Sequence, residues 1–370
     1  MHSYDILVRG SGCVARSLAL ALGAQGLRVA LLGTAEPSAA QRGDVRSYAL
    51  NAASVALLRE LKVWGSLAAD AASPVHEMQI QGDQQGASLG FSAWQQGVSE
   101  LAFIVDAGEL ESQLALALRF SPHVQIVDRP VPAALEALCE GRDSQRRSEL
   151  GIDFHLHGYG QRAIAARLVA AEAHQGIARQ WFRSPDVLAL LPFERPEPQR
   201  SYGLVWSLPE ARVAELMALD AAAFEATLCE ACGMAPGSLQ LASERASWPL
   251  AIARAEAMSG PGWVLLGDAA HLVHPLAGQG LNLGLGDVAA LARVLAAREP
   301  WRPLGDAKLL RRYERERLAP TWAMGELTDG LLKLFASEAA PLRSLRNQGL
   351  TLLDSVSPLK RWLTRQALGA

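Results

Sequence analysis

The sequence has little net charge, few cysteines and no long apolar run, and each shortage excludes a class of protein. Its 370 residues hold 35 Lys and Arg against 38 Asp and Glu, a formal net charge of −3, which gives no basic field for nucleic acid. No run reaches the ~18 uninterrupted apolar residues of a membrane-spanning helix, and no basic, apolar leader opens the chain. We therefore expect a cytoplasmic protein without a nucleic-acid partner, soluble or peripherally attached to a membrane.

The 4 cysteines give no disulfide framework or zinc site. Cys229 and Cys232 form a C-x-x-C, the spacing of a redox pair or of half a zinc site, but no second Cys/His pair stands at ligand spacing. The surrounding segment has the composition of an Ala/Glu-rich helix, and a reducing cytoplasm keeps thiols free. We interpret both cysteines as residues of that helix. The sequence also lacks a Ser-His-Asp arrangement or a metal-ligand cluster.

Hydrophobic periodicity predicts an α/β (α+β) fold. An apolar strand at Asp5–Val8, an Ala/Leu-rich helix at Val14–Ala24 and a strand at Arg28–Leu32 form a βαβ unit. Runs that alternate apolar and polar residues over 75–105 and 154–210 indicate antiparallel strands. The other predicted elements are helices at 51–67, 107–119, within 210–233 and from 280 almost to the end, and strands at 124–127 and shortly before residues 139 and 267. Because βαβ and antiparallel pieces alternate, we expect two interleaved domains.

A glycine motif follows the first strand. In this G-x-G-x-x-A, Gly10 permits a tight turn, Gly12 lets the backbone approach a pyrophosphate, and Ala15 keeps helix and strand close. The phosphates of a dinucleotide would bind free N–H groups at the helix N-terminus. The acidic residue expected at the end of the second strand, where it would hold the adenosine ribose, is replaced by Gly33, and Glu36 follows three residues later.

A second glycine-rich segment is more specific. An apolar strand at Val264–Leu266 delivers Asp268 at its carboxyl end, where the carboxylate can accept hydrogen bonds from a polyol such as a ribityl chain. The amides of Gly278–Gly280, at the start of a long helix, can hold a developing anion such as the N1–C2=O edge of a reduced flavin. A plain glycine turn would not explain why Asp, His, Pro, Gln and Asn crowd around these glycines.

At this segment the sequence resembles a known family. GDAAHLVHPLAGQGLNLGLGDV, from Gly267 to Val288, is similar to the flavin-binding GD motif of the para-hydroxybenzoate-hydroxylase-type flavoprotein monooxygenases, and is closest in kind to the UbiH/VisC ubiquinone-biosynthesis hydroxylases. The likeness extends along most of the chain. Further segments that resemble the family's motifs are Asp44–Leu50, Tyr159–Ala163, His174–Phe182, Leu188–Pro192 and Trp248–Leu250.

The resemblance implies a Rossmann-like FAD-binding domain interleaved with an antiparallel-sheet substrate domain and a C-terminal helical region. The expected ranges are 1–74, 101–153 and 255–300 for the FAD-binding domain, 75–100 and 154–254 for the substrate domain, and 301–370 for the helical region. It further implies an enzyme that uses FAD, NAD(P)H and O2 to hydroxylate a phenolic, polyprenylated ring in ubiquinone biosynthesis. Two alternatives stay open: a non-catalytic flavoprotein-like scaffold of a quinone-biosynthesis complex, and a flavin-dependent reductase of prenyl chains.

The resemblance also assigns roles to single residues. Arg46 would lie near the flavin and Pro275 beside its oxygen-reacting face, whereas His271 or His274 would relay a phenol proton or simply pack in the loop. The expected catalytic residues are therefore Pro275, Arg46 and His271, and no metal ligand is expected. The expected cofactor-binding residues are Gly10, Gly12, Ala15, Arg46, Gly267, Asp268, Gly278, Gln279, Gly280 and Asn282.

The ADP half of the site departs from the family's pattern. A fingerprint of Asp-Gly followed by Ser and Arg, which touches the pyrophosphate and is linked to NAD(P)H use, is matched at Glu140–Arg147 with Glu140 in place of Asp. A strand meander of roughly twenty residues is missing, which leaves a Pro-containing link at Asp128–Ala137. Together with Gly33, these changes predict looser FAD binding on this side, or a paralogue that has drifted from catalysis.

The C-terminal region, residues 328–368, intersperses Leu, Phe and Trp with Lys and Arg. An amphipathic helix of this kind can lie on an anionic membrane surface, which would suit a lipid-tailed substrate and a place at the inner membrane. The same apolar stripe more often packs on the body of the protein or on a partner subunit, and packing is the interpretation we prefer.

Overall fold

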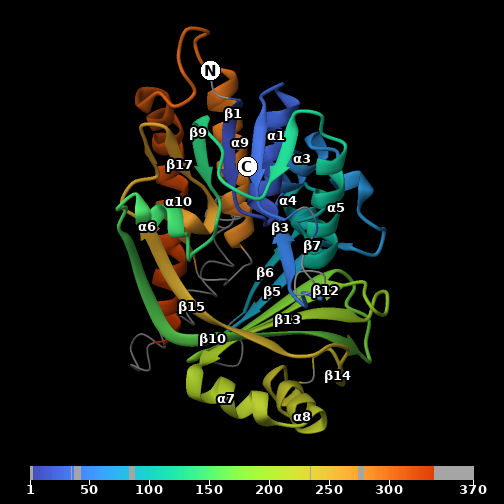
Figure 1. Ribbon diagram of the computed structural model, residues 1–370. Coiled ribbons are helices and arrows are strands. Elements are labelled where there is room, and N and C mark those ends of the chain that lie inside the picture. The colour runs from blue at the N-terminus through green and yellow to red at the C-terminus, as the bar shows by residue number, and fades with distance from the viewer. Residues whose placement is uncertain are drawn as a thin grey trace.

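The computed structural model describes residues 3–34, 36, 43–82, 88–233, 235–273 and 279–336. Within these ranges two large sheets lie one above the other, with a small sheet between them (Figure 1). The upper, six-stranded sheet has the order β16 (Ser259–Gly260), β17 (Trp263–Leu265), β9 (Ala133–Leu138), β1 (Tyr4–Arg9), β2 (Val29–Leu32) and β8 (Val124–Val127). All its strand pairs are parallel except β16 with β17.

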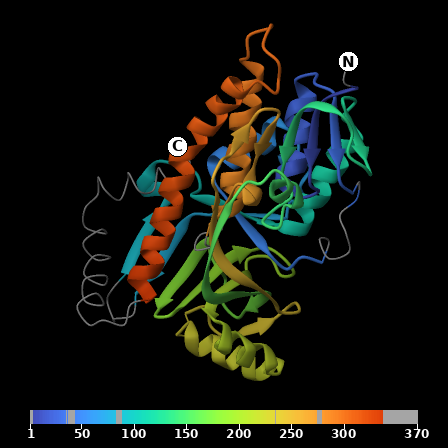
Figure 2. The same cartoon turned by 60° about the vertical axis from the view of Figure 1, so that its left-hand side comes forward.

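Helices complete the six-stranded layer because parallel strands need crossover connections. Helix α1 (Cys13–Ala24) packs against both α5 (Ala107–Arg119) and α9 (Gln279–Ala296). Helix α1 is buried along almost its entire length. Its apolar residues pack with those of β1 and β2 in the larger of the two main cores. Helix α10 (Ala307–Ala336) packs on α9 and runs down one side of the molecule to the level of the lower sheet (Figure 2).

The lower sheet has nine strands. Its order is β18 (His271–Leu272), β15 (Ala246–Ala255), β10 (Phe154–Ala170), β13 (Ser201–Pro209), β12 (Asp186–Phe193), β11 (Ile177–Arg183), β5 (Glu77–Gln81) and β6 (Ser88–Ser92), with β14 (Leu239–Leu241) beside β10. Helices α7 (Glu210–Ala218) and α8 (Ala221–Ala231) cover its lower face and enclose a second core that includes Trp181, Trp206 and Phe224. The upper face of this sheet is turned toward the six-stranded layer.

The two large sheets are joined by shared segments. Strands β10 and β15 pair along most of their length, with a register shift between Gly158 and Arg162, and they rise from the lower sheet toward the upper one (Figure 1). The small sheet consists of β3 (Ser47–Leu50), β7 (Ala102–Asp106) and β4 (Ala72–Val75). The remaining elements are α3 (Ala52–Glu60), α4 (Ala93–Gln96), α6 (Gln145–Glu149) and the 3₁₀ turns η1 (Trp64–Ser66) and η2 (Gly267–Ala269).

The βαβ opening, the helix at 107–119, the strand at 124–127 and the antiparallel strands within 154–210 are confirmed. Two predictions are wrong. The helix predicted over 51–67 ends at Glu60, because Lys62 adopts a left-handed backbone with φ 60°. The interval 128–137 is not a plain link, because β9 begins at Ala133 and pairs with β1 and β17. The same strand, Ala133–Leu138, confirms the strand predicted shortly before residue 139.

The described part of α10 ends at Ala336, so most of the amphipathic stripe predicted at 328–368 lies outside the described residues. Among the described helices, none is both long and apolar enough to cross a membrane. The thiols of Cys229 and Cys232 are free at the end of α8, and the described residues contain no His, Cys, Asp and Glu cluster suited to a metal ion.

Candidate flavin-binding site

The first glycine turn closes tightly on β9. Gly10 has φ 125°, and a Cβ at this position would lie 2.3 Å from the carbonyl oxygen of Cys139. Only glycine can occupy such a position, because other residues neither adopt this backbone nor tolerate the contact. Gly12 is the N-cap residue of α1, and Ala15 is fully buried behind the turn. The predicted turn is therefore present, with the N-terminus of α1 at the carboxyl edge of the parallel sheet.

A carboxylate lies at this helix N-terminus. Oε1 of Glu111, a residue of α5, accepts a hydrogen bond at 3.0 Å from the N–H of Cys13, the first residue of α1. A Cβ on Gly12 would lie 3.7 Å from the same oxygen. The other oxygen, Oε2, accepts from Nη1 of Arg16 at 2.6 Å, and both side chains of this ion pair are buried. Burial raises the pKa of Glu111 above its ordinary value, an effect that Arg16 opposes.

Gly33 is held against the same turn. A Cβ at Gly33 would lie 2.9 Å from the carbonyl oxygen of Gly10, so the acid expected here has no room for its side chain. Glu36 lies on the surface, with its carboxylate 3.9 Å from Nη1 of Arg119. Beside Gly33, a cavity of about 430 Å³ is lined by the β8 strand and by Asp128 and Arg129, the first residues of the link to β9.

The GD turn, Gly267–His271, follows β17, and hydrogen bonds to a buried carboxylate hold its backbone in place. Asp287 of α9 is completely buried, and its Oδ2 accepts from the N–H of Gly267 at 2.8 Å and from Nε2 of His271 at 2.7 Å. Its Oδ1 accepts from Nε of Arg317 at 2.6 Å. Burial alone would raise the pKa of Asp287, but the charges and hydrogen bonds of His271 and Arg317 bring this pKa below its usual range. Asp268, by contrast, is exposed on the outside of the turn.

The GD turn also packs on the first glycine turn. Gly267 has φ 58°, and a Cβ there would lie 3.3 Å from Cγ2 of Val14. A Cβ on Gly284 of α9 would lie 2.6 Å from the same methyl group, so glycine at this position lets α9 approach α1 closely. From the other side, Arg147 donates from Nη1 to the carbonyl oxygen of Ala269 at 2.8 Å. This hydrogen bond connects the Glu140–Arg147 segment directly to the GD turn.

Asn282, predicted to bind the cofactor, connects α9 to neighbouring elements. Its Oδ1 accepts from the N–H of Asn51 at 3.0 Å and from the hydroxyl of Ser54 at 2.7 Å, and its Nδ2 donates to the carbonyl oxygen of Ala49 at 2.8 Å. Gly280 lies in the first turn of α9, which begins at Gln279. His274, Pro275 and Gly278 lie outside the described residues, as does the side chain of Gln279.

Arg46 lies just before β3 at the junction of the two layers. Its Nε donates to both carboxylate oxygens of Asp44, at 2.9 and 2.8 Å, and its guanidinium lies 5.6 Å from the ring centre of Trp248. Nearly half of the Arg46 side-chain surface, 45%, is exposed, so the guanidinium can be approached from solvent. The ring centre of Tyr48 lies 5.9 Å from the same guanidinium.

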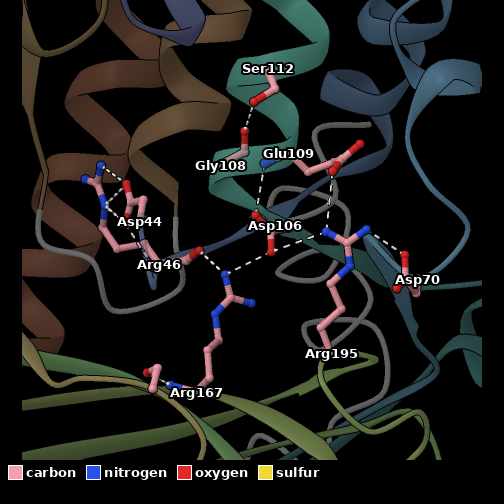
Figure 3. A network of polar contacts seen from close by, with 10 residues as sticks. Asp44, Arg46, Asp70, Asp106, Gly108, Glu109, Ser112, Arg167 and Arg195 are labelled. Carbon is pink, nitrogen blue, oxygen red and sulfur yellow. Dashed lines mark hydrogen bonds and ion pairs between the residues drawn. The ribbon is translucent and has the colours of Figure 1, made fainter. Parts of the chain in front are cut away.

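A polar network, missed by the sequence analysis, crosses the junction (Figure 3). Arg167 rises from β10 and donates from Nη2 to the carbonyl oxygen of Arg46 at 2.8 Å and to Asp106 at 3.3 Å. Asp106 is the N-cap of α5, and Arg195 lies within 3.8 Å of the same carboxylate. Arg167 is 8% exposed and stacks on Phe193 at 4.0 Å, yet its Nη1 has no hydrogen-bond partner among the described residues.

These features fit an FAD molecule. The close backbone at Gly10 and Gly12 suits a pyrophosphate, and the exposed carboxylate of Asp268 suits a ribityl chain. Glu111 of α5, which accepts a hydrogen bond from the Cys13 N–H, carries a charge that opposes a phosphate at this turn. The site can therefore hold the cofactor once this carboxylate moves or is neutralised.

Comparisons with known proteins agree with this geometry. A family model described as an FAD binding domain matches residues 127–328. The ubiquinone hydroxylase UbiL of Rhodospirillum rubrum is 32% identical over 389 residues, covering 99% of this chain and 89% of that protein. The 3-demethoxyubiquinol 3-hydroxylase of Escherichia coli is 30% identical and covers 99% of this chain and 98% of that protein.

Solved structures share the fold. PqsL, a probable FAD-dependent monooxygenase from Pseudomonas aeruginosa, superposes with a TM-score of 0.75 at 20% identity, covering 94% of this chain and 99% of that one. The p-nitrophenol 4-monooxygenase PnpA of Pseudomonas putida gives a TM-score of 0.76 at 17% identity, covering 100% and 99%. Because the FAD-domain match spans more than half of the chain and the hydroxylase matches span nearly all of it, the protein belongs to the family of FAD-dependent monooxygenases that includes the ubiquinone hydroxylases.

Proposed function

We propose that this FAD-dependent monooxygenase hydroxylates the phenolic ring of a polyprenylated ubiquinone precursor. The observation that carries the proposal is the GD turn, whose backbone is fixed by the buried Asp287 while Asp268 stays exposed for a ligand. A scaffold protein would have no need to keep such a turn. The two relatives named above act on ubiquinone or demethoxyubiquinol by their names, and both align with this chain over almost its full length.

In the proposed complex, FAD lies against the six-stranded layer, residues 1–74, 101–153 and 255–300, and the ring of the substrate against the upper face of residues 75–100 and 154–254. Gly10, Gly12 and Ala15 admit the pyrophosphate. The resemblance assigns the flavin side to Gly267, Asp268, Gly278, Gln279, Gly280 and Asn282. When bound, the flavin, reduced by NAD(P)H, supplies the transfer of one oxygen atom from O2, and the other oxygen leaves as water.

The residues near the reacting edge take distinct roles in this proposal. The resemblance assigns Pro275, which lies outside the described residues, to the oxygen-reacting face of the flavin, and Arg46 would present a half-exposed cation to the flavin. His271 uses Nε2 to bind the buried Asp287, which leaves only Nδ1 for a proton. We therefore favour a positioning role for His271: its bond to Asp287 holds the turn that carries Asp268.

We propose that Arg167, whose buried Nη1 lacks a hydrogen-bond partner among the described residues, meets the substrate oxygen. A phenol becomes more nucleophilic as its proton leaves, and a nearby cation stabilises the charge that develops on the oxygen. Arg167 offers an unpaired Nη1 donor on the upper face of the lower sheet, and its other contacts hold the guanidinium rigidly over Phe193. The side chain is thus organised before the substrate arrives.

The test is to measure NAD(P)H oxidation, O2 consumption and product mass with purified, FAD-loaded protein and a short-chain polyprenyl phenol. The expected result is a product that gains one oxygen atom, with one NAD(P)H and one O2 consumed for each product molecule. Reduction of the prenyl chain without O2 consumption would overturn the proposal. Bound FAD with no substrate-stimulated NAD(P)H oxidation would overturn it as well.

A further inference from the structure

The N-terminus of α1 already binds an anion that belongs to the protein. The first N–H groups of a helix lack partners within the helix, and in dinucleotide-binding folds they receive the pyrophosphate. Here the N–H of Cys13 donates at 3.0 Å to Oε1 of Glu111, and the thiol of Cys13 lies 3.2 Å from the same oxygen. Gly12, whose missing side chain should leave room for a phosphate, faces this oxygen.

The carboxylate is held there by a buried cation. Arg16 is 0% exposed, and its Nη1 donates to Oε2 of Glu111 at 2.6 Å and to the carbonyl oxygen of Glu111 at 3.1 Å. Its Nε and Nη2 have no hydrogen-bond partner within the described part of the chain. Arg16 therefore remains as a positive charge beside the turn when the carboxylate turns away, and it can then interact with a phosphate instead.

We propose that Glu111 is a residue of the FAD site that competes with the pyrophosphate for the N-terminus of α1, so that FAD binds as Glu111 takes up a proton and gives up the Cys13 N–H. The proposal depends on the use of FAD and not on the substrate proposed above. A carboxylate and a pyrophosphate repel each other at contact distance, and only one of them can accept the Cys13 N–H in a good geometry.

The proposal predicts that FAD binds more tightly at lower pH. The ionisable groups around Glu111 are Cys13 and Arg16 of α1, Arg46 before β3, and Tyr48 of β3. The two arginines stay charged and the cysteine and tyrosine stay neutral near pH 7, since burial raises the pKa of both latter groups. Glu111 is thus the group in this cluster whose proton uptake accompanies binding, and its pKa is already raised by burial.

The first experiment uses the unaltered protein stripped of FAD. Calorimetric titrations with FAD at pH 8, in buffers of different ionisation enthalpy, should detect net proton uptake, and the Kd should increase as the pH is raised from 6 to 8.5. ADP, which carries the pyrophosphate, should show the same proton uptake, whereas riboflavin should show none. A Kd for FAD that does not change with pH, without proton uptake, would overturn the proposal.

The second experiment compares Glu111→Gln with a charge-matched control, Glu60→Gln, on the exposed end of α3. Glu111→Gln keeps the shape but removes the repelling charge, so it should bind FAD at least about tenfold more tightly at pH 8. Its Kd should also lose most of its pH dependence, while the control should match the unaltered protein. Equal or weaker FAD binding by folded Glu111→Gln would show that Glu111 only supports the helix pair. The calorimetry of the unaltered protein decides the matter if this variant does not fold.

Discussion

Asp287→Asn should be among the most costly single changes at the flavin site. An amide has one acceptor oxygen for the donors that Gly267, His271 and Arg317 present at 2.8, 2.7 and 2.6 Å, so its NH2 group must face another donor. Arg317 also loses its counterion in a buried setting, and breaking a buried pair in this way costs about 3 to 5 kcal/mol. An unfolding entropy of about 2.1 cal/mol/K per residue, taken over 370 residues, converts about 4 kcal/mol into a Tm lower by roughly 5 °C.

The assay is thermal unfolding followed by circular dichroism at pH 7.5. Asp306→Asn is the matched control, because it keeps the oxygen that accepts a hydrogen bond from the Leu309 N–H at 2.9 Å and loses only an ion pair with Arg302, in which the Asp306 side chain is 29% exposed. This control should lie within about 1 °C of the unaltered protein. The difference between Asp287→Asn and the unaltered protein should persist at neutral pH and shrink as the pH falls below about 4, since the folded pKa of Asp287 lies below its unfolded value. A Tm for Asp287→Asn equal to that of the control would refute the reasoning.

Three further changes test the two halves of the site. Gly10→Ala should abolish FAD retention on gel filtration, measured by visible absorbance, because its Cβ would lie 2.3 Å from the Cys139 carbonyl oxygen. Gly33→Asp, which restores the acid of the usual motif, should weaken FAD binding in a fluorescence titration, because its Cβ would lie 2.9 Å from the Gly10 oxygen; a lower Kd would contradict the steric argument. Arg167→Met should raise KM for the phenolic substrate by about tenfold in steady-state assays and leave the Kd for FAD unchanged; a shift in FAD affinity instead would move Arg167 out of the substrate site.

The elements that the sequence predicts well are those whose local pattern and tertiary role agree. The α5 helix is an example, with an Asp106 N-cap and a buried stripe through Leu110, Leu114 and Leu118. The predicted helix over 51–67 failed because Val63 continues the apolar spacing although Lys62 adopts a left-handed backbone that ends the helix. Strand β9 is the strand predicted shortly before residue 139, but its first residues were taken for part of a link, because AALEAL favours a helix locally and only the parallel strands on either side impose an extended backbone.

The chemical groups of the site were predicted unevenly for a similar reason. Motifs whose members are adjacent in the sequence, such as Gly10 with Gly12 or Gly267 with Asp268, can be recognised from spacing alone. The ion pair of Arg16 with Glu111 joins residues 95 apart, and Arg167 reaches Asp106 across 61 residues. A usable signal was present in each case: a charged residue within an otherwise apolar face, Arg16 next to Ala15 and Glu111 next to Leu110. Such a residue needs a partner, but the sequence does not say which one.

The strand β18 has a consequence for how the enzyme changes its substrate during evolution. Residues of β17 belong to the upper sheet, whereas His271 and Leu272, only six residues further on, hydrogen-bond to β15 of the lower sheet as β18. The peptide that we propose to place the cofactor is thus anchored by backbone bonds in both layers, independently of the side chains on the upper face of the lower sheet. Side chains on that face can be exchanged to admit a differently decorated ring without altering the spacing between ring and cofactor. The same backbone arrangement can therefore accommodate different aromatic substrates, and each change of substrate requires only side-chain substitutions on that face.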